Sequence, residues 1–166
     1  MDKIVILKNK AGKKGFKVLD DEHRERLAKS CSDFFVLDEL ARDDNRDVRW
    51  NVATNPYTTA KTLALLAKDP DNNVRLNVAC NHNTSPLVLG ELAKASVTTI
   101  RCGVALNPNT KASTLHRLAT DTDFYVRYNA LVNPNTGPNT LFIACNNEKH
   151  PTLIALARHH FAKKVK

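Results

Sequence analysis

Apolar residues along the chain fall into two alternating sets with helical spacing. One set is a short segment with two valines a helical turn apart, such as Val74 and Val78. The next set is a Leu-x-x-Leu-Ala pattern, such as Leu63, Leu66 and Ala67. Spacings of three and four residues place side chains on one face of a helix. The pattern therefore predicts pairs of helices, each with one buried face.

The helix pair recurs with a period of 26 residues. Its clearest mark is an arginine that follows Val or Ile, and it stands at Arg49, Arg75, Arg101 and Arg127. A period in this range is typical of helical-repeat proteins, in which each unit packs only against its neighbours. The sequence thus predicts an all-α solenoid of about five units, each made of two helices.

Polar residues between the two helices of a unit predict where each helix begins and ends. Each first helix is expected to end at an asparagine that bonds the turn backbone, at Asn55, Asn81, Asn107 and Asn133. A threonine three residues later is a good helix N-cap, and it stands at Thr58, Thr84, Thr110 and Thr136. We expect the second helix, which these threonines would begin, to be the longer of the two.

The two ends of the chain differ from the repeats. Ile4–Leu7 is apolar and mostly β-branched, and Ala11–Gly15 carries a turn signal, so a short β-hairpin that caps the array is expected. A basic arm without regular structure is the alternative. The predicted organisation is an N-terminal basic segment and cap (1–29), a repeat solenoid (30–152), and a C-terminal capping helix with a basic tail (153–166).

The net charge of +8 lies at the two ends. Residues 1–29 and 148–166 each carry +4, whereas residues 30–147 are neutral. A groove that follows nucleic acid would be expected to carry its basic surplus in the repeats. The charge pattern therefore weighs against nucleic acid without excluding it. No signal-peptide pattern and no membrane-spanning apolar run occur, so we expect a cytoplasmic protein that does not enter membranes.

The sequence offers no constellation for catalysis or metal binding. The four cysteines lie far apart without a C-x-x-C pair, and a reduced state is expected. The six histidines show no metal-ligand spacing, and the pair His159–His160 is only a weak signal. Paired carboxylates such as Asp20–Asp21 are better explained by helix capping. We therefore expect no catalytic residue, no metal, no cofactor and no small-molecule substrate.

The recurring arginines are interpreted as a structural ladder rather than an anion-binding row. An aspartate precedes three of them by six residues: Asp43 before Arg49, Asp69 before Arg75, and Asp121 before Arg127. Such pairs would bridge adjacent units, since guanidinium and carboxylate groups match in shape. Ala95 takes the place of the aspartate before Arg101. Arg101 is therefore expected to be the ladder arginine that remains free for a partner.

Partner-binding residues are expected where the repeats differ from one another. The positions that vary lie on and after the second helix of each unit. We expect partner contacts from six residues: Arg42, Lys68, Lys94, Arg101, His116 and Arg117. Ordinary solvated surface charge is the alternative interpretation. Trp50 and Tyr128 share one position of the repeat, and we interpret both as core residues.

The segment from Leu37 to Asn147 repeats the motif V-R-x-x-V-A-x-N-P-x-T followed by L-x-x-L-A-x-D. This motif resembles the leucine-rich repeat variant family and, more loosely, HEAT-type repeats. The resemblance implies a right-handed superhelix of alternating helices and no common enzymatic activity. One kind of protein in that family holds an iron–sulfur cluster in an N-terminal cysteine cluster. Here Cys31 stands alone in the N-terminal region, so that cofactor is not expected.

Together these patterns predict a non-enzymatic repeat protein that binds a macromolecule. A protein partner is the leading interpretation, for an adaptor, inhibitor or scaffold. The alternative is a HEAT-like solenoid that binds nucleic acid through a basic face. An enzyme that acts on a nucleobase is a third possibility, and it would need acidic or aromatic residues in the groove that the sequence does not locate.

Overall fold

The computed structural model describes residues 3–8 and 14–165, with side chains from Leu19 onward. Most of the expected turn at Ala11–Gly15 lies outside the described residues. The chain divides into two compact units, an N-terminal unit of Met1–Thr84 and a C-terminal unit of Ser85–Lys166. Both units are built mainly from helices that pack against helices one or two places away in the sequence.

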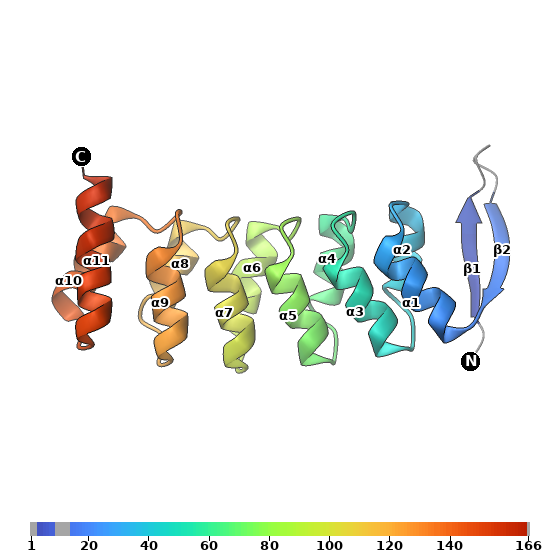
Figure 1. The fold of residues 1–166 in the computed structure, drawn as a ribbon, viewed down its shortest axis with the longest axis horizontal. Helices are drawn as coiled ribbons and strands as arrows, with labels where there is room; N and C mark the ends of the chain where they lie inside the picture. Colours follow the sequence, from blue (N-terminus) through green and yellow to red (C-terminus); the bar gives the residue numbers. More distant parts are fainter. Residues whose placement is uncertain (1–2, 9–13, 166) are drawn as a thin grey trace. The chain divides into compact units, whose positions relative to one another are not determined.

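The N-terminal unit begins with two antiparallel strands. β1 (Lys3–Lys8) pairs with β2 (Lys14–Leu19), and Lys3 stands opposite Leu19. Five helices follow: α1 (Asp21–Ser30), α2 (Phe34–Leu40), α3 (Arg46–Thr54), α4 (Ala60–Leu66) and α5 (Asn72–Cys80). α3 packs between α1 and α5, and the strands contact α1 and α2 (Figure 1).

The C-terminal unit continues the same alternation. Its helices are α6 (Pro86–Leu92), α7 (Thr98–Leu106), α8 (Ala112–Leu118), α9 (Phe124–Val132), α10 (Pro138–Asn147) and α11 (Pro151–Lys164). α9 packs between α7 and α11, while α8 contacts both α7 and α9 (Figure 1). Each unit is therefore a helical repeat, as the 26-residue period predicts.

The relative lengths of the two helices in a repeat differ from the expectation. The first helices (α3, α5, α7 and α9) have nine residues each, whereas the second helices α4, α6 and α8 have seven. α4 stops early because its last turn tightens, with the amide of Lys68 bonded to Leu65 and that of Asp69 bonded to Leu66. Hydrogen bonds between residues three apart commonly close the end of a helix. The expectation of a longer second helix is therefore wrong for α4, α6 and α8, whereas α10, with ten residues, is longer than α9.

The threonine that recurs in each repeat does not cap the second helix. The N-cap is one residue later, at Thr59 before α4 and at Ser85 before α6. The buried hydroxyl of Thr58 instead donates to the carbonyl oxygen of Val52 at 2.6 Å. That carbonyl belongs to the last turn of the first helix, where carbonyl groups lack helical partners. The threonine therefore fastens the end of one helix rather than the start of the next.

The core of each unit consists of the apolar residues that the period selects. Val48, Val52, Leu63, Val74 and Val78 are fully buried in the N-terminal unit. The equivalent buried set of the C-terminal unit is Leu89, Ile100, Val104, Leu115, Val126, Leu141 and Leu153. A single helix pair exposes this face, so burial depends on the neighbouring pair in the same unit.

Candidate partner-binding surface

Arginines and carboxylates bridge successive turns in each unit. Arg49 donates from Nε and Nη2 to both carboxylate oxygens of Asp69, at 2.6 and 3.1 Å. Arg101 binds Asp121 in the same way, at 2.7 and 3.0 Å. The Nη1 atom of each arginine donates to a carbonyl oxygen six residues earlier, that of Asp43 or Ala95. Each guanidinium therefore joins its own turn to the turn 20 residues later.

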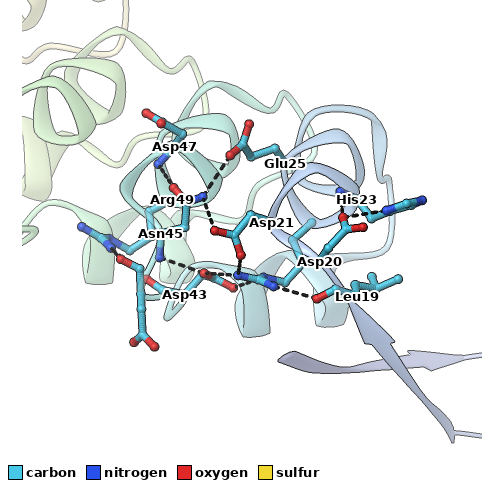
Figure 2. A network of polar contacts seen from close by, with 11 residues as sticks. Leu19, Asp20, Asp21, His23, Glu25, Asp43, Asn45, Asp47 and Arg49 are labelled. Carbon is cyan, nitrogen blue, oxygen red and sulfur yellow. Dashed lines mark hydrogen bonds and ion pairs between the residues drawn. The ribbon is translucent and has the colours of Figure 1, made fainter. Parts of the chain in front are cut away.

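Two further pairs extend this arginine–carboxylate ladder. Arg24 is buried and binds Asp43, with Nε and Oδ2 separated by 2.8 Å. Asp43 also accepts from the amide of Asn45 (Figure 2). Arg127 binds Glu148 through Nε at 2.9 Å. The expected pairing of each arginine with the aspartate six residues earlier is therefore wrong. Arg24 and Glu148 are not expected in the ladder at all from the sequence, because they lie one residue out of register, at separations of 19 and 21 rather than 20.

The expectation that Arg101 is free is wrong, because Asp121 occupies its guanidinium. The physical reason is that the carboxylate comes from the turn after the arginine, while the turn before it supplies only carbonyl oxygens. Arg75 is the ladder arginine without a carboxylate partner among the described residues. It donates to the carbonyl oxygens of Asp69 and Pro70 and to the side chain of Asn72. The residue 20 positions after Arg75 is Ala95.

Buried asparagines tie each repeat to the one before it. The Nδ2 atom of Asn133 donates to the carbonyl oxygens of Ala105 and Asn107, at 2.7 and 3.0 Å. Its Oδ1 atom accepts from the amide of Asn135 at 2.9 Å. Asn81 makes the equivalent bonds in the N-terminal unit, to Ala53 at 2.8 Å. These asparagines are turn residues, as expected, and in addition they connect neighbouring repeats.

The ladder perturbs two carboxylates of the C-terminal unit. Burial acts to raise the pKa of Asp121, but hydrogen bonds from Arg101 and from the amide of Asp123 outweigh it and lower the pKa. Burial likewise acts to raise the pKa of Glu148. The amides of His150 and Lys149, together with Arg127, reverse that effect and lower the pKa. Both side chains are therefore ionised and structural at neutral pH.

Three of the expected partner-binding residues line one hollow of the C-terminal unit, of about 650 Å³, which we call the Arg117 hollow. Lys94, Arg101 and Arg117 share its wall with hydroxyl side chains, those of Ser96, Thr98, Thr120 and Thr122. Lys94 forms an exposed ion pair with Glu91 at 2.9 Å. Arg117 donates from Nη2 to the carbonyl oxygen of Gly90 at 3.1 Å. Among the described residues, its guanidinium has no carboxylate partner.

His116 lines a second hollow of the same unit, of about 350 Å³, which we call the His116 hollow. The Nδ1 atom of His116 lies 3.0 Å from the hydroxyl oxygen of Thr140. Thr120 and Asp121 line both hollows, so the two are adjacent. The structure thus gathers Lys94, Arg101, His116 and Arg117 on one surface.

The remaining two expected residues belong to the N-terminal unit. Arg42 directly follows the C-cap of α2 and forms an exposed ion pair with Asp38 at 2.9 Å. Lys68 is exposed just after α4. Each follows the second helix of its repeat, as Lys94 follows α6.

The interpretation of Trp50 and Tyr128 as core residues is wrong. Their side chains are 40% and 37% exposed. Trp50 lines a hollow of the N-terminal unit together with Arg46 and Asn73. Aromatic residues that are partly exposed are frequent in binding surfaces, so this position adds a second candidate contact site on a first helix.

The fold and these surfaces define a helical-repeat protein with a hydrogen-bonded framework and variable exposed helices. Within the described residues, no three His, Cys, Asp or Glu side chains are grouped as metal ligands. None of the described helices combines the length and hydropathy needed to cross a membrane. No family model, curated protein or solved structure matches this chain.

Proposed function

We propose that this chain is a non-enzymatic repeat protein that binds a protein partner through the second helices of its C-terminal unit. The observation that carries the proposal is that two sets of polar residues make different contacts. Most polar residues that recur between repeats bond the framework, whereas several that vary, such as Lys94, His116 and Arg117, line open hollows.

Most framework residues are unavailable to a partner because their polar atoms are engaged, and Arg127, whose Nε and Nη1 alone are bonded, is the exception. Asp121, for example, accepts two bonds from Arg101 and one from the amide of Asp123. Asn133 is buried and bonded at both ends of its amide. Lys94 and Arg117, in contrast, sit on an open surface beside several hydroxyl groups. Mixed polar surfaces with arginine are typical of protein–protein interfaces.

The repeat motif supports a place in the leucine-rich repeat variant family, with the right-handed superhelix that this resemblance implies. The strands β1 and β2 contact α2 and α1 respectively, which supports a role for the hairpin as an N-terminal cap. Terminal units of repeat arrays need such caps, because their outer face has no neighbour.

Nucleic-acid binding is the second candidate, and one observation favours it. The last half of α11 carries Arg158, Lys163 and Lys164 on its exposed surface and contains no acidic residue. Lysines and arginines grouped in this way attract phosphates. The basic group lies at the chain's end rather than along the repeats, so we rank this candidate below a protein partner.

Affinity capture with the whole 166-residue chain tests the leading proposal. The variant Lys94→Glu/Arg117→Glu reverses two charges of the Arg117 hollow, and Lys111→Glu/Lys163→Glu reverses two exposed charges elsewhere in the same unit. The wild type and the second variant are expected to retain a common protein that the first variant loses. Equal recovery by all three proteins, or a turnover abolished by a single surface substitution, contradicts the proposal.

A further inference from the structure

The last pair of the ladder leaves a guanidinium nitrogen without a partner. Arg49 and Arg101 each use both Nε and Nη2 on one carboxylate. Arg127 reaches Glu148 through Nε alone. The other oxygen of Glu148 accepts the amides of Lys149 and His150, both at 2.9 Å. Among the described residues, the Nη2 atom of Arg127 has no hydrogen-bond partner.

Arg127 lines the His116 hollow together with other groups that carry N–H donors. Lys149, Asn147 and His116 also line it, and the side chains of Lys149 and Asn147 have no hydrogen-bond partner within the described chain. The remaining wall is partly apolar, with Ala119, Ile143 and Ala144. A hollow of about 350 Å³ with an apolar wall and several donors suits one or two side chains of a ligand.

The charges around the His116 hollow favour an anion. Its two carboxylates are already neutralised, because Asp121 binds Arg101 and Glu148 binds Arg127. The ammonium group of Lys149 has no carboxylate partner among the described residues. A carboxylate that entered the hollow would therefore meet one uncompensated positive charge and one free guanidinium N–H, both of which strengthen a hydrogen bond.

We propose that the His116 hollow binds the carboxylate of an acidic side chain in a peptide segment of the partner protein. The carboxylate accepts from Arg127 Nη2 and from Lys149, and its methylene groups lie against Ile143 and Ala144. A peptide fits better than nucleic acid, because nucleic acid needs a row of cations along its backbone rather than one partly apolar hollow. This inference rests on the proposed function and names the chemistry of the partner.

Amide NMR spectra of the isotope-labelled 166-residue chain test the inference. The probe is a capped peptide, Ala-Ala-Glu-Ala-Ala, and its matched control is the same peptide with glutamine in place of glutamate. We expect the glutamate peptide to shift the amides of Thr120, Ile143 and Lys149. The reference is the affinity of the wild-type chain for the glutamate peptide. The glutamine peptide should bind the wild type at least about fivefold more weakly, because a hydrogen bond to a charged group is lost. The variant Lys149→Gln should bind the glutamate peptide more weakly by a similar factor, for the same reason.

The variant Lys111→Gln removes an exposed charge outside the hollow and should bind as the wild type does. Arg127→Lys keeps the charge but removes Nη2, and it should also weaken binding. The inference is overturned if no shift appears up to the solubility limit of the peptide, or if the glutamine peptide binds equally well. It is also overturned if a single-stranded DNA oligonucleotide shifts the same amides at lower concentration than the peptide.

The failures of the two proposals are distinguishable. If affinity capture recovers a partner but the glutamate peptide leaves the His116 hollow unchanged, only the carboxylate assignment fails. The opposite result is that the peptide binds in the His116 hollow, but capture recovers no protein whose retention requires Lys94 and Arg117. In that case the proposed function fails while the carboxylate site stands.

Discussion

The guanidinium of Arg101 donates to both carboxylate oxygens of Asp121, which follows it by 20 residues and belongs to the next turn of the C-terminal unit. The two side chains are only 13% and 10% exposed. Partly buried pairs of this kind gain hydrogen bonds that exposed pairs lack, but they are costly to break because one charge remains buried. The pair therefore fixes the spacing between successive repeats.

Replacement of Asp121 by asparagine is expected to lower the free energy of unfolding by about 2 kcal/mol, because Arg101 keeps its charge but loses its counter-ion. Urea denaturation followed by circular dichroism measures the change. Glu39→Gln is the matched control, since Glu39 is exposed, and it should change stability by less than about 0.5 kcal/mol. Similar values for the two variants would show that the ladder contributes little.

Asn133 provides a neutral counterpart to the charged ladder. Asn133→Ala is expected to destabilise the chain by about 2–3 kcal/mol, because two buried carbonyl groups and one amide lose their partner. Asn139→Ala removes an exposed asparagine of α10 from the same unit. Thermal unfolding of both variants should show a clear fall in Tm for the first only. An unchanged Tm for Asn133→Ala would refute the role assigned to the buried asparagines.

The pH dependence of stability follows from the two perturbed carboxylates. The ordinary pKa values of Asp121 and Glu148 are 3.8 and 4.5, and the folded chain lowers both. The unfolded chain therefore binds protons more readily, so the stabilisation is present above these values and is lost as pH falls through the lower folded pKa. Urea denaturation at a series of acidic pH values should show this loss.

The variant Glu148→Gln isolates one of the two contributions. It should be less stable than the wild type at neutral pH, and the difference should shrink as the pH falls below 4.5, the ordinary pKa of that side chain. A difference that stays constant across the acidic range would mean that the ionisation of Glu148 does not contribute to stability.

Much of the fold could be predicted from sequence, because the same pattern recurs every 26 residues and identifies the buried positions of each repeat. Val74, Val78 and Leu63 are buried, and Asn81 ends α5, as the pattern indicates. One feature that it misassigned is the hydroxyl of Thr58, which has two possible acceptors close in sequence. A side chain near a helix end can bond the helix before it or the one after it, and local spacing does not separate these outcomes.

The sequence separation between arginines and aspartates does not predict which carboxylate each ladder arginine binds. An aspartate six residues before an arginine and one 20 residues after it are equally regular in a periodic sequence. The three-dimensional direction of the arginine side chain selects between them, and it sends Nη1 to its own turn and Nε to the next. The His116 hollow depends on a finer detail, because Glu148 stands one residue out of register.

The glycine of α6 offers a test of the helix packing. A Cβ atom at Gly90 would meet only the hydroxyl of Thr114, at 3.8 Å, which is ordinary van der Waals contact. Gly90→Ala is therefore expected to stabilise the chain by about 0.5–1 kcal/mol, because alanine loses less backbone entropy in a helix. Urea denaturation measures the gain. A loss of stability would mean that the surroundings of α6 are tighter than the structure shows.

Binding to duplex DNA at several salt concentrations separates the two candidate functions. If the repeats bind protein, DNA binding should be weak and should come from the basic end of α11. About two to three phosphate contacts would give a log–log salt slope of roughly −2 to −3. Charge reversal of Lys163 and Lys164 should abolish this binding, because both lysines are exposed at that end.

Charge reversal of Arg42, Lys68 and Lys94 is the informative comparison, because these residues follow the second helices of successive repeats. Under the proposed function the triple variant binds DNA as the wild type does. The contrary result is a log–log salt slope steeper than about −5 for DNA binding. If the triple variant lost this steep slope and the Lys163 and Lys164 reversal kept it, several phosphate contacts would have to lie along the repeats. That result would replace the protein partner with nucleic acid, since residues within the repeats would then bind phosphates.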